Sequence, residues 1–412
     1  MAAPTTDRAS LSSANVQGNS NSFENTISKN GRFVAFESTA SNLIGTDANA
    51  AQDIFVRNRK SGKTTRASVR TNGAEANGGS SAPQISHSGR FVAFTSNATN
   101  LIGLDGNGTS DVFVRDRDRK KTTRVSTRSN GGEANGSSSV DGISGDGRYV
   151  VFSSNASNLV PGDSNGTTDV FVKDRKTGKT RRVSERTNGA QGNGTSDNSA
   201  ISPSGRYVAF VSTATNLVPN DSNGQHDVFV HDRKNKKTVR ASVANNGAQG
   251  NSTSYWPAMA NNGSVAFPSF ATNLVPNDTN ANWDVFVHNI KTDKTRRVSV
   301  NSAGTEGNGN SGLIFGPPKI SPDGERIAFD SQATNLVGGD SNGAIDVFLH
   351  NRANQTTRRV SVRFDGTQSN GQSLMGDISS NGKFVSFLSN ATNLVGGDTN
   401  GFYDVFVRGP IN

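Results

Sequence analysis

The apolar residues of this chain fall in short runs that recur along its whole length. Each repeat contains four runs of strand-like composition, separated by turns rich in Gly, Asn, Asp and Ser. The second run reads RFVAF or a close variant, the third reads DVFV or DIFV, and the fourth resembles TTRVS. The first is predicted to end at Ile27, Ile85, Ile143, Ile201, Met259, Ile320 and Ile378. The pattern therefore predicts an all-β fold built from four-stranded units.

A glycine in the turn before the second strand marks each repeat, where it can adopt positive φ. These glycines are Gly31, Gly89, Gly147, Gly205, Gly263, Gly324 and Gly382. Their successive spacings are 58, 58, 58, 58, 61 and 58 residues. The longer spacing reflects extra residues around the segment GLIFGPPK. The chain therefore contains seven units.

Apolar residues occupy consecutive positions in the second and third strands, so both faces of each sheet must be buried. Phe recurs at two fixed positions per unit, such as Phe94 and Phe113, and these 14 positions take most of the 22 Phe residues. Small sheets arranged around an axis cover one another on both faces. We therefore predict a single seven-bladed β-propeller over residues 1–412, with four antiparallel strands per blade.

The two ends of the sequence favour a closed ring over an open stack. The chain ends with a third strand, DVFVRG, and begins with the segment Thr5 to Leu11, which matches the fourth strand Thr64 to Val69. This N-terminal strand is predicted to complete the last blade beside Asp404 to Val407. A solenoid would require atypical capping repeats, which the pattern does not show.

The repeat SPSGRYVAF…DVFVHDRKNKKTVRAS resembles that of the TolB-like β-propeller family, with its Pro-Asp-Gly type of turn. The resemblance covers nearly the whole chain and implies the propeller fold. It implies less about function, because the family includes periplasmic scaffold proteins, gating domains of peptidases and some polysaccharide lyases. This chain differs from the multi-domain members in consisting of blades alone.

The composition limits the chemistry and the location that we expect. The chain has no Cys, which excludes disulfides and thiol-based metal sites. No apolar run is long enough to cross a membrane. The sequence begins MAAPTTDR, without the features of a signal peptide, and resembles a mature chain after signal removal. We therefore expect a secreted or periplasmic protein, and a monomer.

The propeller topology places the loops on two faces with different charge. Lys- and Arg-rich turns such as RDRDRKK and HDRKNKK lie on one face and account for much of the formal net charge of +9. This basic face predicts either nonspecific contact with polyanions or a solvated rim. The turns carry no interleaved aromatic residues that could stack on bases. The opposite face gathers Asp, Asn, Gly and Ser, and we call it the Asp/Asn face.

An Asp-x-Asn-x-x-x-Asp motif recurs before each third strand on the Asp/Asn face. Alternating oxygen ligands followed by Gly are typical of the start of a calcium loop. The alternative is a purely structural Asx turn, in which the side chain bonds its own backbone. The candidate ligands are Asp47, Asn49, Asp53, Asp105, Asn107, Asp111, Asp163, Asn165, Asp169, Asp221, Asn223, Asp227, Asp278, Asn280, Asp284, Asp340, Asn342, Asp346, Asp398, Asn400 and Asp404.

A second motif, Gln/Glu-x-Asn-x-x-Ser, leads into each blade on the same face. Examples are Glu75, Asn77 and Ser80 in the second repeat. Its regularity predicts hydrogen bonds between adjacent blades, which would satisfy exposed loop backbone.

Catalytic constellations are not evident in the sequence. Three of the five His residues, His231, His288 and His350, take the position held by Arg or Lys in other blades, so we expect them at solvated strand ends. No nucleophile elbow and no phosphate-binding loop is found. The leading prediction is a non-enzymatic binding scaffold. The alternative is a polysaccharide lyase or hydrolase with its site at the channel mouth.

Aromatic and large apolar residues break the symmetry of the repeats on the Asp/Asn face. Both Trp residues fall in blades five to seven. The residues predicted to contact a protein or glycan partner are Tyr255, Trp256, Trp283, Phe315, Met375, Phe402 and Tyr403. Exposed aromatic rings beside hydrogen-bonding groups are typical of such contact sites. The alternative is that they fill the channel.

Overall fold

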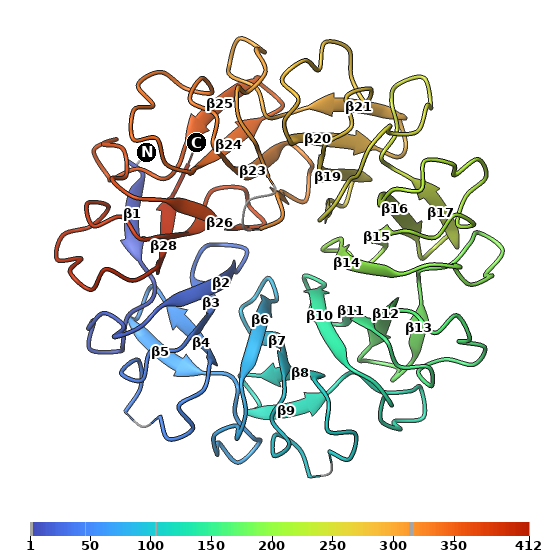
Figure 1. The fold of residues 1–412 in the computed structure, drawn as a ribbon. Helices are drawn as coiled ribbons and strands as arrows, with labels where there is room; N and C mark the ends of the chain where they lie inside the picture. Colours follow the sequence, from blue (N-terminus) through green and yellow to red (C-terminus); the bar gives the residue numbers. More distant parts are fainter. Residues whose placement is uncertain (1–2, 46, 104, 313–315, 412) are drawn as a thin grey trace.

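The computed structural model describes residues 3–45, 47–103, 105–312 and 316–411, and these form seven four-stranded antiparallel sheets around a central channel (Figure 1). Blade 1 consists of β2 (Ser22–Ile27), β3 (Phe33–Ser38), β4 (Asp53–Asn58) and β5 (Lys63–Arg66). Blade 2 consists of β6 (Ser80–Ile85), β7 (Phe91–Ser96), β8 (Asp111–Asp116) and β9 (Lys121–Arg124). Blade 3 consists of β10 (Ser138–Ile143), β11 (Tyr149–Ser154), β12 (Asp169–Asp174) and β13 (Thr180–Arg182). Blades 4 and 5 consist of β14 (Ser196–Ile201), β15 (Tyr207–Ser212), β16 (Asp227–Asp232) and β17 (Lys237–Arg240); and β18 (Ala258–Met259), β19 (Ser264–Ser269), β20 (Asp284–Asn289) and β21 (Lys294–Arg297). Blade 6 consists of β22 (Lys319–Ile320), β23 (Arg326–Ser331), β24 (Asp346–Asn351) and β25 (Thr356–Arg359), and blade 7 of β26 (Ser373–Ile378), β27 (Val385–Ser389), β28 (Asp404–Gly409) and β1 (Thr5–Arg8). The first strand of each blade lies nearest the channel, and the predicted fold is confirmed.

The N-terminal strand closes the ring, as predicted. Strand β1 pairs antiparallel with β28, with Thr5 opposite Gly409 and Arg8 opposite Phe406. The observed strand is shorter than the predicted segment and ends at Arg8. Beyond it, the Ser10 hydroxyl still donates to the buried carboxylate of Asp404. The last sheet therefore joins the two ends of the chain.

The core lies between the blades, because each sheet is covered on both faces. One cluster, for example, joins Val56 of blade 1 to Val92 and Phe94 of blade 2. The two Phe rings of each blade lie side by side on adjacent strands. In blade 2, the ring centroids of Phe94 and Phe113 are 5.9 Å apart. Both rings are fully buried. Burying a Phe side chain stabilises a fold by about 1.5–3 kcal/mol, so these repeated pairs are a principal source of stability.

The glycine of the turn before the second strand has a packing role in addition to its conformation. Gly89 has φ +76°, and a Cβ atom there would lie 2.2 Å from the ring of Phe33 in the preceding blade. The guanidinium of Arg117 covers the same ring at 4.7 Å from its centroid. The turn therefore needs Gly for both its φ and the close approach of the aromatic ring.

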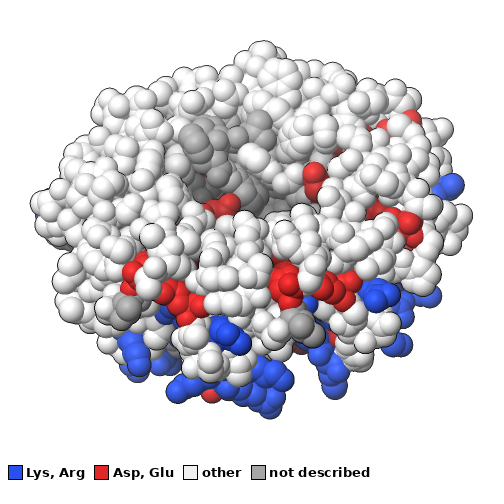
Figure 2. Space-filling view, turned by 60° about the horizontal axis from the view of Figure 1, so that its bottom comes forward, with Lys and Arg blue, Asp and Glu red and all other residues white. Residues whose placement is uncertain are grey.

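The two faces differ in charge as predicted. Lys and Arg gather along the lower edge in Figure 2, whereas the upper surface around the channel mouth carries few charged groups. The turns themselves contain no aromatic residues, but aromatic rings of other strands lie against their arginines. Arg175 lies over the ring of Phe91 and Arg233 over the ring of Tyr149, each reaching into the preceding blade. Strands of neighbouring blades supply these rings, which is why the turn sequences did not reveal them.

Within the described ranges, no helix is long and apolar enough to span a membrane.

Candidate functional site

The last Asp of each Asp/Asn motif is the first residue of a third strand and is completely buried. Asp111 illustrates the arrangement. One of its carboxylate oxygens accepts a hydrogen bond from the Ser126 hydroxyl at 2.5 Å. The other lies 2.7 Å from the Arg124 guanidinium, which also lies 3.4 Å from Asp105. Both acidic residues of the motif are thus held by one buried arginine.

An equivalent arginine ends the fourth strand of every blade. Each makes ion pairs with both Asp residues of its loop, and we call this set the arginine clasp: Arg8, Arg66, Arg124, Arg182, Arg240, Arg297 and Arg359. The arginine clasp was not predicted from the sequence. The signal was the Arg that recurs in the TTR segment and in its equivalents.

The Asn of the motif behaves as an Asx turn. The Asn107 Oδ1 atom accepts from the Thr109 amide at 2.9 Å, and its Nδ2 atom donates to the Ala134 carbonyl at 3.0 Å. The second contact reaches the segment that leads into the next blade. Both functional atoms of the side chain are therefore engaged with backbone, which favours the structural interpretation of this position.

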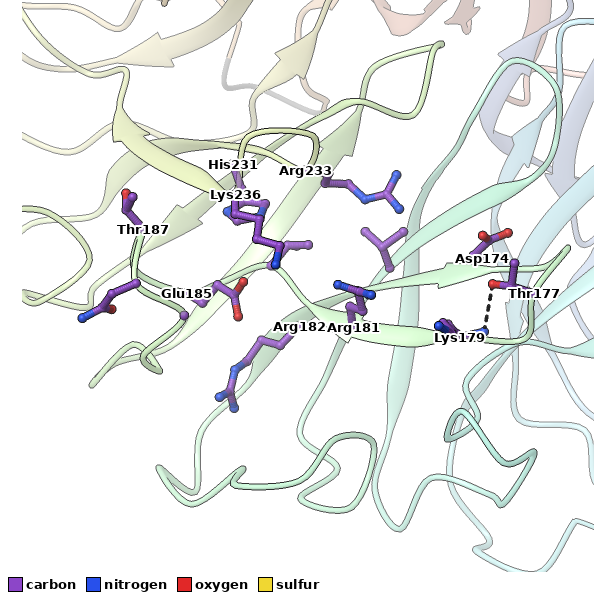
Figure 3. A pocket seen from close by; sticks show the side chains of 14 residues that line it. Asp174, Thr177, Lys179, Arg181, Arg182, Glu185, Thr187, His231, Arg233 and Lys236 are labelled. Atoms are coloured by element: carbon purple, nitrogen blue, oxygen red, sulfur yellow. Dashed lines mark hydrogen bonds between the residues drawn. The ribbon is translucent and has the colours of Figure 1, made fainter.

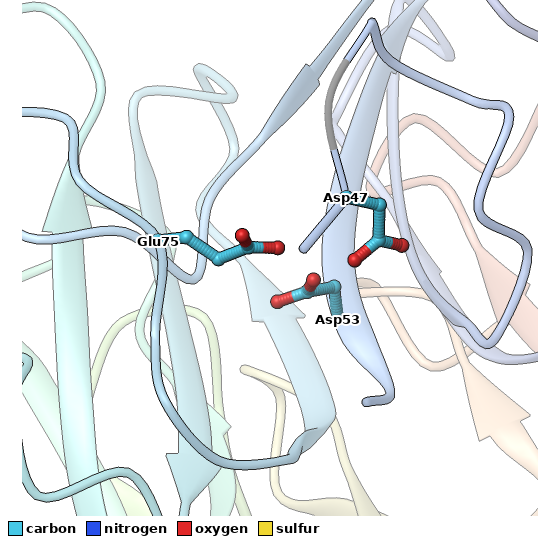
Figure 4. Close-up of side chains that lie close together, drawn as sticks. All are labelled: Asp47, Asp53 and Glu75. Atoms are coloured by element: carbon cyan, nitrogen blue, oxygen red, sulfur yellow. The ribbon is translucent and has the colours of Figure 1, made fainter. Parts of the chain in front are cut away.

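Three of the seven loops bring three carboxylates together and could hold a metal ion. In blade 1 these are Asp47, Asp53 and Glu75, whose ligand atoms lie within 4.8 Å of one another (Figure 4). The equivalent groups are Asp105, Asp111 and Glu133, and Asp278, Asp284 and Glu306. However, the Arg66 guanidinium lies 3.4 Å from Asp47 and 3.2 Å from Asp53, where a cation would bind. Burial, together with the neighbouring carboxylates, raises the pKa of Asp53 to about 6.

In the other four blades a Gln replaces the third carboxylate. The Gln191 amide donates to Asp163 at 2.8 Å and to Asp169 at 3.1 Å. An amide donor satisfies the same oxygens that an ion would bind. The residues present therefore fit a metal only in the three Glu-containing loops, and there only if the arginine moves.

The second repeated motif makes contacts both between and within blades. Glu75 accepts a hydrogen bond from the Ala48 amide of the preceding blade at 3.1 Å, as predicted. Asn77 instead bonds within its own blade, where it donates to the Thr99 hydroxyl at 2.9 Å. Ser80 likewise bonds Ser96 at 2.9 Å. The Ser80 backbone amide also donates to the Gln52 carbonyl of the preceding blade at 2.8 Å, so the first and last positions of the motif link neighbouring blades.

The prediction that three His residues lie at solvated strand ends is wrong. His231, His288 and His350 are 3%, 2% and 1% exposed, and the Nδ1 atom of each lies 2.9 Å from a Thr hydroxyl. They occupy three different blades. Burial, with a smaller effect from a nearby Arg, lowers the pKa of both His231 and His350 to about 4. The hairpin that leads into each blade covers this position, and hairpin packing is not visible in the strand pattern.

Part of the predicted aromatic sector forms one continuous cluster. The ring centroids of Tyr255 and Trp283 lie 6.0 Å apart, and Phe270 lies 5.7 Å from Trp283. On the other side, His226 lies 4.8 Å from Tyr255, and its Nδ1 atom is 3.1 Å from the Tyr255 hydroxyl. Phe270 is 41% exposed. We call these four residues the aromatic cluster.

The remaining predicted contact residues lie elsewhere. Trp256 turns toward the channel, where its indole N–H donates to Asn198 at 2.9 Å. Tyr403 packs partly against the core between blades 7 and 1, and Phe402 is 36% exposed. Phe315 and the Met375 side chain lie outside the described residues. The predicted sector is therefore divided among blade 5, the channel and blade 7.

Two members of the aromatic cluster were missed in the sequence. Phe270 replaces the Asn or Thr found at the matching position of most other blades, such as Asn97 and Asn155. His226 occupies the position that corresponds to Trp283 in the next blade. Comparison of the repeats position by position would have revealed both residues.

A groove of about 530 Å³ opens between blades 3 and 4 on the outer surface (Figure 3). Lys179, Arg181 and Lys236 line it together with the acidic Glu185. Cationic side chains in a groove attract anions. The groove is therefore a place where the basic side of the molecule could contact a polyanion.

No family model matches the chain, and no curated protein matches its sequence. Among solved structures, it is similar to the β-propeller domain of the Trilobed protease from Pyrococcus furiosus, at 12% identity and a TM-score of 0.56, over 94% of this chain and 93% of that one. It is also similar to an oligogalacturonate lyase from Vibrio parahaemolyticus, at 10% identity and a TM-score of 0.51, over 99% and 90%. TolB from Acinetobacter baumannii matches at 12% identity and a TM-score of 0.44, over 82% of this chain and 62% of TolB. The shared fold is a β-propeller, here with seven four-stranded blades.

The similar structures include an oligogalacturonate lyase and a domain of a protease, so the similarity does not decide between binding and catalysis. This chain spans less than two thirds of TolB. At such low identities only the fold is shared, and function must be argued from the residues of this propeller itself.

Proposed function

We propose that this propeller is a non-enzymatic binding protein that presents its Asp/Asn face to a glycan or protein partner, with the aromatic cluster as the contact site. The observation that carries the proposal is the continuous path from His226 through Tyr255 and Trp283 to the exposed Phe270. Other blades carry small or polar residues at most of these positions. An exposed aromatic path at one place on a repetitive surface is typical of a binding site.

The surroundings of the aromatic cluster favour a glycan over a protein. The face around the channel mouth carries few charged groups (Figure 2). Next to the cluster, Thr253 and Gln225 form a surface hydrogen bond of 2.9 Å, which shows the amide and hydroxyl character of the rim. Flat aromatic rings beside neutral amides and hydroxyls match the alternating apolar and hydroxyl surfaces of a sugar.

The test compares the protein with a Tyr255→Ala/Trp283→Ala variant on a panel of insoluble and arrayed neutral polysaccharides. We expect retention of the unaltered protein on at least one glycan and at least a tenfold weaker interaction for the variant, because aromatic residues dominate such contacts. Phe402→Ala is the matched control, since Phe402 is also exposed on this face but lies outside the cluster. Equal retention of all three proteins would contradict the proposal.

The arginine clasp supports a structural role for the Asp/Asn loops, and we propose that arginine rather than calcium neutralises them. Each guanidinium already occupies the position between two carboxylates. Calcium binding would therefore need displacement of a buried cation in blades 1, 2 and 5.

We also propose that the basic groove between blades 3 and 4 makes only nonspecific contact with polyanions. Such contact depends on charge alone and is lost at high salt. The secreted or periplasmic location and the monomeric state remain predictions, which cell fractionation and light scattering would test. Turnover of polyuronides or other glycans by the purified protein would favour the lyase or hydrolase alternative.

A further inference from the structure

The seven inner strands differ from one another far more than the rest of the blades do. In blades 1 to 5 and 7 the segment that contains the inner strand runs from a Ser to an Ile or Met, but the residues between these ends are different in each of these blades. The described segments read FENT, SAPQ, SVDG, DNSA, YWPA and LMGD in blades 1 to 5 and 7. The core and the arginine clasp repeat almost unchanged around the ring. Structural requirements alone therefore do not explain this variation in the segments that line the channel.

The inner strands enclose a chamber of about 390 Å³ that opens toward the Asp/Asn face. Below it, a second space of about 170 Å³ is lined by the Ile residues that end the inner strands, including Ile27, Ile85 and Ile201. The two spaces share Asp141 and Lys319 in their walls. The chamber is thus polar above and bounded by an aliphatic ring below.

Asn25 provides an unpaired amide in the wall of this chamber. Its side chain is 4% exposed, and neither its Oδ1 nor its Nδ2 atom has a hydrogen-bond partner among the described residues. A Cβ atom at Gly376 would lie 2.3 Å from the Asn25 Oδ1 atom, so only Gly leaves room for this side chain. A buried amide without partners is destabilising, and a bound ligand with polar groups would satisfy it.

Carboxylates outnumber cations in and beside the chamber. Glu24 and Asp141 line it, Asp377 lines the space below, and the buried Glu37 lies close enough to Glu24 to feel its charge. Lys319 is the single cationic side chain among the described residues of the chamber wall. Burial raises the pKa of Asp141 and of Glu37 to about 7, and a nearby cation lowers the pKa of a carboxyl group, so the chamber favours a ligand that brings positive charge.

Hydrogen bonds fix the orientation of the Asp141 carboxylate. One of its carboxylate oxygens accepts hydrogen bonds from Ser153 and Ser199, each at 2.6 Å. Trp256 lines the same chamber, and its indole N–H donates a hydrogen bond to Asn198. Its backbone φ is +40°, a conformation that a bulky residue rarely adopts. A strained aromatic residue beside positioned carboxylates is typical of a functional site. Indole faces also attract organic cations.

We propose that the chamber is a second binding site, distinct from the aromatic cluster, for a small protonated primary amine that also carries hydroxyl or amide groups. The ammonium group lies among Glu24 and Asp141, and the polar groups of the ligand pair with Asn25. The carboxylates disfavour a uronide or another anion in this place.

Trp256 gives a direct readout of the site. The chain has two Trp residues, so a Trp283→Phe variant leaves Trp256 as its only indole and also weakens the aromatic cluster. This variant is titrated with glucosamine, N-acetylglucosamine and glucuronate, and with spermidine as an amine of different shape. We expect saturable fluorescence changes with the amines and at least tenfold weaker binding of the neutral and anionic sugars, because a charge-assisted hydrogen bond is lost.

Two further variants separate charge from folding in the Trp283→Phe background. Glu24→Gln should weaken amine binding about tenfold without unfolding the protein, because Glu24 is exposed to the channel. Asp118→Asn, which removes a carboxylate that is 72% exposed and belongs to the basic face, should leave it unchanged. The proposal is overturned if no amine alters Trp256 fluorescence, if glucuronate binds as well as glucosamine, or if Glu24→Gln binds like its parent. None of these results depends on glycan binding at the aromatic cluster.

Discussion

The guanidinium of Arg233 in blade 4 lies 4.1 Å from the centroid of the Tyr149 ring in blade 3. The same guanidinium donates a hydrogen bond to the Gly205 carbonyl in the turn of its own blade. Gly205 in turn has no Cβ that would collide with the Tyr149 ring, which a Cβ would approach to 2.3 Å. The Tyr149 ring of blade 3, the Gly205 turn and the Arg233 guanidinium of blade 4 thus form one contact between the two blades.

Replacement of Arg233 by Ala should destabilise this contact. We expect a loss of about 1–2 kcal/mol in the free energy of unfolding, because a partly desolvated cation–π contact and a hydrogen bond disappear together. Denaturant unfolding followed by circular dichroism measures the change. In blade 5 Ile290 takes the position equivalent to Arg233, and the next residue, Lys291, reaches over Tyr207 at the longer distance of 5.9 Å. Lys291→Ala should therefore cost less, and an equal loss in both variants would contradict the argument.

Calcium should not stabilise the unaltered protein. We expect melting temperatures in EDTA and in millimolar calcium to agree within about 1 °C, because a ligand raises stability only if it binds the folded state. A clear rise with calcium would show that an ion displaces the arginine clasp.

Removal of one arginine of the clasp should make the stability of the protein depend on calcium. Arg124→Ala leaves Asp105, Asp111 and Glu133 without their cation, and breaking such a buried pair typically costs about 3–5 kcal/mol. The melting temperature of this variant should rise when calcium is added, since the emptied group of carboxylates can then bind the ion. Arg182→Ala is the matched control, because its loop has Gln191 in place of the third carboxylate. It should respond less to calcium.

Acid should destabilise the protein through its buried histidines. The pKa of His231 and of His350 falls from the ordinary 6.5 to about 4 on folding, because burial disfavours the charged ring. Between these values the unfolded chain binds more protons than the folded protein, so the free energy of unfolding decreases as the pH falls from 6.5 to 4. The loss reaches about 3 kcal/mol per site below pH 4.

His231→Gln and His350→Gln variants isolate this effect. A neutral Gln does not titrate, so the difference in unfolding free energy between variant and parent should shift by about 3 kcal/mol per site between pH 7 and pH 4. The charged neighbours that affect the pKa of these histidines are Asp232 and Arg233 for His231 and Arg352 for His350. The variants retain all three of these neighbours. The raised pKa of buried carboxyls such as Asp53 acts in the opposite direction, so only this comparison is decisive. Parallel pH curves would contradict the assignment.

Deletion of residues 1–11 should open the ring. The deletion removes the ladder between β1 and β28 and the ion pairs of Arg8 with Asp398 and Asp404. We expect a markedly lower melting temperature, restored when a peptide of residues 3–13 is added, because an exposed sheet edge binds a matching strand. A scrambled peptide of the same composition serves as the control. An unchanged melting temperature after deletion would show that closure contributes little.

The repeat made the fold predictable from sequence. The predicted ends of the inner strands, such as Ile27 and Ile378, are the observed ends of β2 and β26. The pairing of the N-terminal strand with the last blade followed from counting strands. These features depend on apolar periodicity, which is local and recurs in seven copies.

The site was less predictable, because its contacts join residues from different blades. The Arg of the repeated TTR segment was assigned no role from the sequence, although the Arg124 guanidinium pairs with both Asp residues of its loop. Trp256 and Trp283 were placed in one sector, but the backbone at Trp256 turns its side chain into the channel. His231 occupies a strand end that the pattern marks as open, yet a hairpin covers it. Sequence spacing within one blade does not contain this information.

The closure of the ring by β1 has a consequence for how the molecule forms. Thr5 and Gly409 are partners in one sheet, although 404 positions separate them in the chain. During synthesis β1 leaves the ribosome long before β28 exists, so it must stay unpaired while six complete blades assemble. Its short length and its charged residues Asp7 and Arg8 keep it from adding to the wrong edge in that interval.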